Sequence, residues 1–191
     1  MPLVAGYCAR YPEVELELHS NEDIIDLIER RIDLAFRVGP LKDSTLHATP
    51  LGSSRLRIQA SPGYLAKHGR PSKISELQNH ILLGFSQADS LNDWPLTDVA
   101  GAPFRIRPNV RSSSGETLRS LALNDAGIVC LSDYLTRRDR ENGQLCELFA
   151  SKTTDMRRLI NAVYYRNTVG ATRIKSFVDY VKAQLRKHPA W

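Results

Sequence analysis

The sequence contains no hydrophobic segment long enough to cross a membrane. None of its apolar runs approaches the roughly 20 residues that a membrane-spanning helix needs. The segment from Met1 to Cys8 has no basic residues at its start, and Tyr7 is too large for the small residue that precedes a signal cleavage site. We therefore expect a helix that ends near Tyr11 and Pro12, with neither a targeting peptide nor a membrane partner.

Cysteine is also scarce, and neither cysteine nor histidine has the spacing of a metal site. There are three cysteines, an odd number, and five dispersed histidines. Cys130 lies in the apolar run from Ile128 to Leu131, where a thiol behaves as a small core residue. This usage argues against a disulfide framework and predicts a reducing, cytoplasmic location with no metal and no cofactor.

Motifs of catalysis and of nucleic-acid binding are absent as well. There is no G-x-S-x-G elbow and no phosphate-binding loop, so we do not expect an enzyme, although a Ser-His-Asp assembly stays open from the sequence alone. The 26 basic and 21 acidic residues give a net charge of +5, and they are scattered. The densest basic stretch, residues 136–140, is interrupted by Asp139, and we interpret it as a solvated helix face. Direct nucleic-acid binding by this chain is not predicted.

The sequence does contain the pattern of a globular α/β protein, which is clearest between residues 14 and 39. Val14 to Leu18 alternates as a strand with one buried face, and Ser20 with Asp23 forms a capping box at a helix start. A short apolar run, Leu34 to Val38, then predicts a buried strand. Strand, helix and strand form a βαβ unit, which builds parallel sheets and binds ligands outside the carboxyl ends of its strands. Those ends carry Ser20, Asn21, Arg37, Val38 and Gly39.

The rest of the chain continues to alternate between strands and helices. We expect extended segments at residues 47–52, 55–60, 81–85, 104–110, 128–131, 145–149 and 159–165. We expect helices that begin at Ser61 and Pro62, at Ile74, at Ser113 with Glu116, at Ser132 and in a final apolar stripe from Ile174 to Leu185. Gly127 is expected to close the helix after Ser113. Residues 86–102 are polar and predict a long, functional or mobile loop.

Five segments occur in an order that resembles one known family. They are ARYPEVELEL, ERRIDLAFRVGPLKDSTLHATPLG, SPGYLAKHGRP, SSSGETLRSLALNDAGIVCLSDYL and RIKSFVDYVKAQL. Together they resemble the C-terminal effector-binding domain of LysR-type transcriptional regulators, from residue 1 to about residue 187. The resemblance implies a fold like that of type II periplasmic binding proteins, with two α/β lobes, each a mixed and mostly parallel sheet flanked by helices. Lobe I would hold residues 1–55 and 159–191, and lobe II residues 56–158.

The resemblance also implies a function and a set of partners. A small effector, which we expect to be an anion such as a carboxylate, would bind between the lobes and shift the packing of a homodimer or homotetramer. Residues 2–10 and 118–125 are the candidate helices for that packing. The family's winged helix-turn-helix and the first strand of its regulatory domain are absent from these residues, so DNA contact is expected only through that N-terminal domain. A periplasmic solute-binding protein of a transporter, which shares the fold, remains the alternative.

Helix starts are the first group of candidate effector-binding residues. Ser20, Ser113 and Ser132 each follow a predicted strand, and the free N–H groups of a helix start suit a carboxylate or a phosphate. The alternative is that each serine only caps its helix, which contributes about 1 kcal/mol.

The remaining candidates lie at strand ends. The planar guanidinium of Arg37 matches a carboxylate, although a structural ion pair with Asp33 or Asp43 is an equal alternative. Phe85 and Ser86 would supply an apolar wall and a hydroxyl. The predicted effector-binding set is therefore Ser20, Asn21, Arg37, Val38, Gly39, Phe85, Ser86, Ser112, Ser113 and Ser132.

Overall fold

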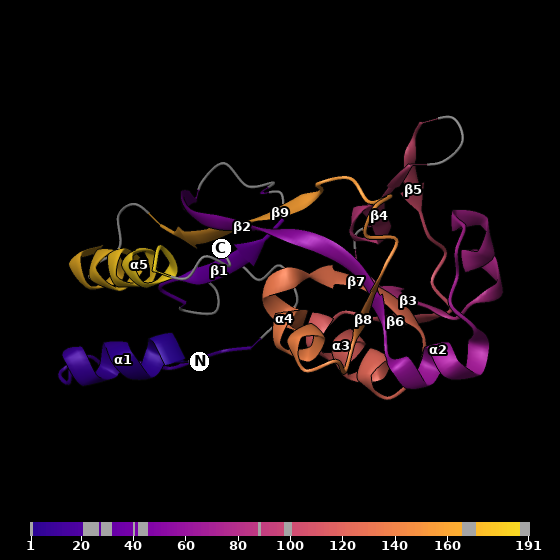
Figure 1. Cartoon of the computed structure of the whole chain (residues 1–191). Coiled ribbons are helices and arrows are strands. Elements are labelled where there is room, and N and C mark those ends of the chain that lie inside the picture. Colours follow the sequence, from indigo (N-terminus) through magenta and orange to yellow (C-terminus); the bar gives the residue numbers. More distant parts are fainter. Residues whose placement is uncertain are drawn as a thin grey trace. The chain divides into compact units, whose positions relative to one another are not determined.

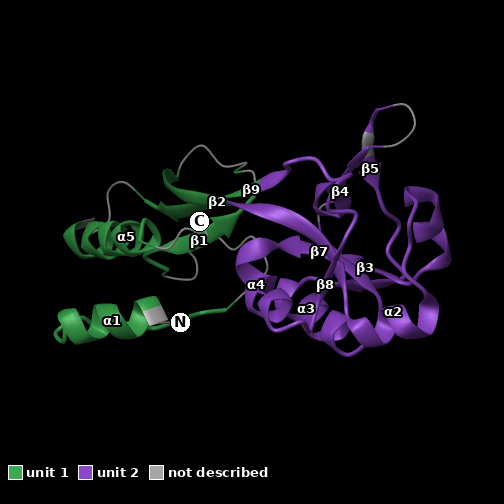
Figure 2. Ribbon diagram, viewed as in Figure 1, with its two compact units in different colours: residues 1–53, 158–191 green, residues 54–157 purple. Residues whose placement is uncertain are grey.

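The computed structural model describes residues 2–20, 27, 32–39, 41, 46–87, 89–97, 101–165 and 171–187. The chain divides into two compact units (Figure 2). Unit 1 consists of Met1–Ser53 and Arg158–Trp191, and unit 2 consists of Ser54–Arg157. Each unit has its own helices and its own buried hydrophobic core. Among the described residues, no helix is both long and apolar enough to cross a membrane.

Unit 1 is a small sheet covered by helices. Its elements are α1 (Pro2–Arg10), β1 (Ala35–Val38), the first half of β2 (His47–Ala60), nearly all of β9 (Arg157–Tyr164) and α5 (Ala171–Leu185) (Figure 1). The strand order is β1–β9–β2, and β1 runs antiparallel to β9 with Ala35 opposite Val163 and Val38 opposite Ile160. The strand β2 is long enough to continue into the sheet of unit 2.

The core of unit 1 forms where α1 and α5 meet. The ring of Tyr7 is 1% exposed, and its centroid lies 4.7 Å from the centroid of Phe177 in an edge-to-face arrangement. The α5 residues that recur at helical spacing are all buried, which confirms the predicted final helix. They are Ile174, Phe177, Val178, Val181 and Leu185.

The predicted βαβ unit at the start of the chain is wrong. Residues 14–18 form no strand, although Val14 and Leu16 pack against the core of unit 1 while Glu15 and Glu17 are exposed. The alternation correctly indicates that Val14 and Leu16 face the core, but it is wrong for Leu18, which is 59% exposed. A strand also needs a hydrogen-bonded neighbour, and no described residue pairs with this segment. The strand predicted at residues 34–38 is present as β1, but it pairs antiparallel and leaves Phe36 49% exposed. Most of the helix predicted after Ser20 lies outside the described residues.

Unit 2 is a sheet with helices and a separate two-stranded hairpin. After the second half of β2 its elements are α2 (Pro62–His68), η1 (Ile74–Asn79), β3 (Leu82–Phe85), η2 (Asp89–Asn92), β4 (Asp93–Thr97), β5 (Pro103–Arg105), β6 (Val110–Ser112), α3 (Gly115–Leu123), β7 (Ile128–Ser132), α4 (Asp133–Glu141) and β8 (Cys146–Leu148). The two stretches predicted at residues 47–52 and 55–60 are the single strand β2.

The sheet of unit 2 is mixed, as predicted. Its order is β2–β7–β3–β6, with β8 paired to the other edge of β2. The strands β7, β3 and β6 are parallel to one another, whereas β2 is antiparallel to β7 and β8. Phe85 lies opposite Ser112, and Leu83 lies opposite Val129. The carboxyl ends of three parallel strands therefore meet at one edge of this sheet.

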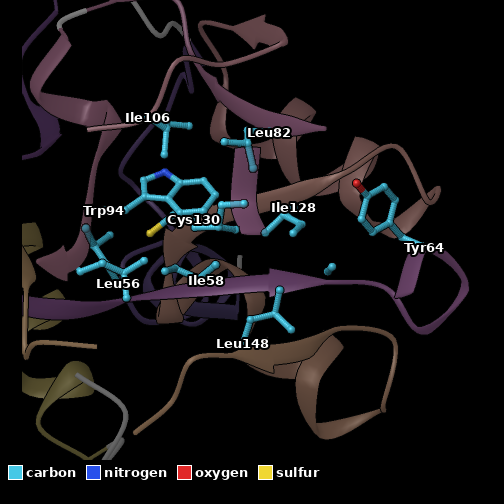
Figure 3. Packing of buried hydrophobic residues seen from close by; sticks show 12 residues of the cluster. Leu56, Ile58, Tyr64, Leu82, Trp94, Ile106, Ile128, Cys130 and Leu148 are labelled. Atoms are coloured by element: carbon cyan, nitrogen blue, oxygen red, sulfur yellow. The ribbon is translucent and has the colours of Figure 1, made fainter. Parts of the chain in front are cut away.

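The core of unit 2 forms around the indole of Trp94, which is 1% exposed (Figure 3). It packs with Ile58, Ile106 and Cys130, so Cys130 is a core residue as predicted. The interpretation of residues 86–102 as a loop is wrong, because this stretch contains η2 and β4. Turn-forming residues surround a short hairpin strand here, and the polar composition hides it.

Two further boundaries also differ from the predictions. The strand predicted at residues 104–110 is split into β5 and β6, which pair with different strands, and Pro108 lies between them without a backbone N–H to donate. The helix expected to close at Gly127 ends instead at Leu123, and Asn124 is its C-cap. Gly127 lies just before β7, where an added Cβ would meet the carbonyl oxygen of Ile81 at 2.5 Å.

Candidate effector-binding site

Unit 2 brings together the predicted residues at the ends of its parallel strands. Phe85 ends β3, Ser112 ends β6 and Ser132 ends β7. The backbone N–H of Ser86 donates to the carbonyl oxygen of Ser112 at 3.1 Å, so the ladder between β3 and β6 continues to this edge. Ser132 is buried, Ser112 is half-buried and Ser86 is exposed. The strands β3 and β7 are short, and nearly all of their residues are buried, which fixes where each strand ends.

The helix α3 begins at this edge, and its N-cap is Ser114. The Ser114 hydroxyl oxygen accepts from the N–H of Thr117 at 3.3 Å, and the Ser112 hydroxyl oxygen accepts from the N–H of Ser114 at 3.1 Å. The capping box predicted for Ser113 and Glu116 is wrong, because Ser113 is exposed and Glu116 bonds to Arg119 instead. Three consecutive serines do not define the register of a cap. The Ser112 O–H has no acceptor among the described residues, so it can donate to a ligand.

The helix α4 begins differently, because the protein supplies its own anion there. Ser132 occupies the N-cap position without a side-chain cap bond. The carboxylate of the next residue, Asp133, accepts from Arg57 at 2.6 Å and from Arg137 at 2.9 Å, and it is also bonded to Arg140. Desolvation opposes its charge, but the hydrogen bonds from Arg137 and Arg57 prevail and lower the pKa of Asp133. A role of Ser132 in ligand binding stays a prediction.

The basic stretch at residues 136–140 is not a simple solvated face, and that interpretation is wrong. Asp139 is buried, and its carboxylate accepts two hydrogen bonds of 2.6 Å from Arg119 of α3. The hydrogen bond to Asp139 raises the pKa of Arg119. Only Arg138 of this stretch projects into solvent as an exposed arginine. The hydrogen bonds between Arg119 and Asp139 connect α3 to α4, and they stabilise the position of α3 beside the strand ends.

The candidates in unit 1 lie on β1 and just after it. Arg37 is half-buried and lies opposite Asn161 of β9, which is buried. Gly39 has a φ of 101°, and its N–H donates to the carbonyl oxygen of Leu159 at 2.8 Å. Val38 is exposed. Asn161 was missed, although a lone amide within the apolar run of residues 160–163 was a signal.

Two further predicted residues contribute little structural information. Ser20 is exposed and lies outside any helix or strand, and Asn21 lies outside the described residues. The alternative ion pair of Arg37 with Asp43 also falls on a residue that is not described. Among the described residues, no group of three or more His, Cys, Asp or Glu side chains could hold a metal ion.

The fold places the chain in a recognisable class. Its α/β architecture is that of the periplasmic-binding-protein-like regulatory domains, and it aligns at a TM-score of 0.78 with the effector domain of the transcriptional regulator AmpR of Pseudomonas aeruginosa. That alignment covers 97% of this chain and 88% of the other at 18% identity, so it concerns the fold alone. Residues 1–186 match the family described as the LysR substrate binding domain. The chain belongs to this family, as the sequence predicts.

One regulator is similar in both sequence and structure. The chain is 47% identical over 184 residues to the HTH-type transcriptional regulator CrgA of Neisseria meningitidis. The match covers 96% of this chain and 62% of CrgA, so the chain spans less than two thirds of that regulator. The CrgA regulatory domain superposes with a TM-score of 0.90 over 96% of this chain and 90% of that one. These relatives are regulators, which does not favour the transporter alternative.

Proposed function

We propose that this chain is the effector-sensing domain of a DNA-binding transcriptional regulator and that it binds a small anion between its two units. The family membership and the similarity to CrgA support the regulatory role. The observation that carries the binding role is the edge in unit 2 where Phe85, Ser112 and the start of α3 come together. Ligands of α/β sheets bind at such strand ends.

The chemistry of this edge suits one end of a small carboxylate. The first turn of α3 offers backbone N–H groups and a partial positive charge, and the Ser112 hydroxyl adds a donor. The first residue of α3 is Gly115, and apolar side chains flank it, because Leu135 and Phe85 lie 3.4 and 3.8 Å from where its Cβ would be. In this proposal Arg37 of unit 1 supplies the counter-charge, because its planar guanidinium matches a carboxylate.

Regulation would follow from a difference in affinity. An effector can shift the domain between two packings only by the free energy with which it prefers one of them. We propose a homodimer or homotetramer in which residues 2–10 and 118–125 contribute to the packing. DNA contact belongs to another part of the full-length protein, which we place in the cytoplasm because a regulator must reach DNA.

Calorimetric titration with a panel of small carboxylates tests the binding site. We expect at least one of them to bind, and we expect Ser112→Ala or Arg37→Ala to weaken it tenfold or more. Ser120→Ala removes an exposed hydroxyl from the same helix and is the matched control, so its affinity should equal that of the parent chain. Equal affinity in all four proteins would remove both residues from the site.

The regulatory role needs a separate measurement, because binding alone would also suit a transporter. The full-length protein should bind operator DNA, and the carboxylate found by titration should change that affinity. Arg37→Ala should retain DNA binding and lose the response to the carboxylate. A full-length protein without DNA binding would contradict the regulatory proposal while leaving the ligand site intact.

A further inference from the structure

Unit 2 contains an open groove that does not include the strand-end residues. It has a volume of about 400 Å³, which is within the range of about 300–1,000 Å³ for small-molecule sites. The groove lies between η2, the segment after β5 and the start of β6. Its walls include Asp89, Arg105, Ile106, Arg107, Pro108 and Arg111.

The three arginines of this groove differ in their partners. Arg105 is paired, because its guanidinium donates to Asp93 at 2.6 and 3.1 Å. Arg107 and Arg111 are exposed, and neither guanidinium makes a side-chain hydrogen bond or ion pair with any described residue. Asp89 is the only carboxylate among the described lining residues. The groove therefore holds two uncompensated positive charges and a single acid.

The backbone that carries these arginines is held on both sides. Asn92 is buried, and its amide bonds both the N–H of Phe85 at 2.8 Å and the carbonyl oxygen of Phe85 at 2.9 Å. The carbonyl oxygen of Asn92 accepts from the N–H of Ile106 at 3.1 Å. Asn109 exchanges two hydrogen bonds of 2.8 Å with the backbone of Leu82.

The same wall packs tightly against β3. An added Cβ at Gly84 would collide with Pro108 and with the amide oxygen of Asn92. The segment that positions Arg107 and Arg111 therefore has little freedom to move away from the sheet. Binding to a site whose walls are already ordered costs less free energy than binding to a site that the ligand must order.

We propose that this groove is a second ligand site, which takes a small anion with two phosphate or carboxylate groups. Arg107 and Arg111 each bind one oxyanion group, because a guanidinium donates two parallel hydrogen bonds to such a group. Ile106 and Pro108 contact the apolar part of the ligand. Asp89 accepts from a hydroxyl or ammonium group and repels long polyanions. Arg105 is already bonded to Asp93, so it is not assigned a role in binding the ligand.

The competing explanation is that these arginines only protect an exposed strand edge. The strand β6 is at the end of the sheet order, and charged residues on edge strands prevent pairing with other chains. A protective role needs charge but no specific geometry. It therefore predicts no saturable binding of a small anion and no difference between arginine and lysine at these positions.

Calorimetric titration with pyrophosphate and with succinate separates these explanations. We expect saturable binding of at least one probe to the parent chain, and the identity of that probe tells phosphate from carboxylate. The double variant Arg107→Gln with Arg111→Gln should weaken binding tenfold or more at an unchanged melting temperature. Arg138→Gln removes another exposed, unpaired arginine of unit 2 and should bind as the parent chain does.

Two further variants make the assignment specific. Ser120→Ala should leave this binding unchanged, because that exposed hydroxyl of α3 is not part of the groove. Replacement of both arginines by lysine should restore the charge but not the affinity, because lysine lacks the bidentate geometry. Absence of saturable binding to the parent chain, or equal affinity in the glutamine double variant, would overturn the proposal.

Discussion

The arginines of unit 2 lie in two regions that differ in how their charge is compensated. On the α4 side, Arg57 and Arg119 donate to the buried carboxylates of Asp133 and Asp139 at 2.6 Å. In the groove beside β6, Arg107 and Arg111 are exposed and have no carboxylate partner among the described residues. The arginines of the first region are bonded to carboxylates of the protein, whereas those of the second are exposed to solvent.

This difference shows why a basic stretch in a sequence is a poor guide to a binding surface. Residues 136–140 contain the densest positive charge, yet Arg137 and Arg140 are bonded to Asp133. Arg107 and Arg111 are four residues apart and unremarkable in the sequence. What decides their availability is the position of acids on other elements, which only the fold reveals.

The largest effect should come from removing the central carboxylate of the α4 side. Asp133→Ala leaves Arg57, Arg137 and Arg140 without their shared acceptor, and removal of one partner from a buried ion pair costs about 3 kcal/mol or more. Urea denaturation should show this loss. Asp155→Ala removes an exposed acid that pairs with Arg55 and Arg157, and it is the matched control. A loss below about 1 kcal/mol for Asp133→Ala would mean that this network is not structural.

The two regions can be compared directly by truncating one arginine in each. Arg119→Ala leaves the buried Asp139 carboxylate without the hydrogen bonds that Arg119 donates, and it should lower the free energy of unfolding by about 2 kcal/mol. Arg107→Ala should change it by less than about 0.5 kcal/mol, because that side chain has no described partner. Both values come from the same denaturation series. Equal losses at the two positions would contradict the distinction between a structural and an available arginine.

A smaller effect should distinguish the neighbouring serines at the start of α3. Ser114→Ala removes the hydroxyl that accepts from Thr117 and should cost about 1 kcal/mol. Ser113 is exposed and does not cap the helix, so Ser113→Ala should cost only a few tenths of a kcal/mol. Thermal unfolding of the two variants measures the contrast. A larger loss of stability for Ser113→Ala than for Ser114→Ala would contradict this assignment and would indicate that Ser113 is the N-cap.

The smallest effect concerns His80, which lies outside both regions. Desolvation, and then repulsion by His68, lower the pKa of His80, and Glu76 only partly opposes this. The unfolded chain therefore binds more protons than the folded chain once the pH falls below the ordinary value of 6.5. The stability that neutral His80 contributes above pH 6.5 is lost as the pH falls through the lowered pKa of His80 in the folded protein. His80→Gln should show a smaller drop in melting temperature between pH 7.5 and 5.5. An equal drop would assign the pH dependence to other groups.

Much of the fold was predictable because its strongest signals are local. The continuous apolar run at residues 128–131 and the helical stripe of α5 depend on residues close in sequence, and both elements are present as β7 and α5. The family followed from five segments in order. The hairpin strand β4 was missed because its Trp94 is surrounded by polar and turn-forming residues. A strand was wrongly predicted at residues 14–18, because a strand needs a hydrogen-bonded neighbour and the alternation of residues does not show whether one exists.

The candidate site was predictable in position but not in detail. Strand ends are readable from where apolar runs stop, so Phe85, Ser112 and Ser132 were named and do share one edge. The sequence did not predict that Ser114 is the N-cap, because three consecutive serines can each cap a helix. The anion at the start of α4 was not predictable either. It depends on Arg57, which is 76 residues away from Asp133.

A crystal structure of the full-length protein saturated with a carboxylate that binds would locate the effector directly. We expect a carboxylate oxygen within hydrogen-bond distance of the Ser112 hydroxyl, near the first turn of α3, with Arg37 bound to the same ligand. A ligand that lies away from the ends of β3, β6 and β7 would contradict it.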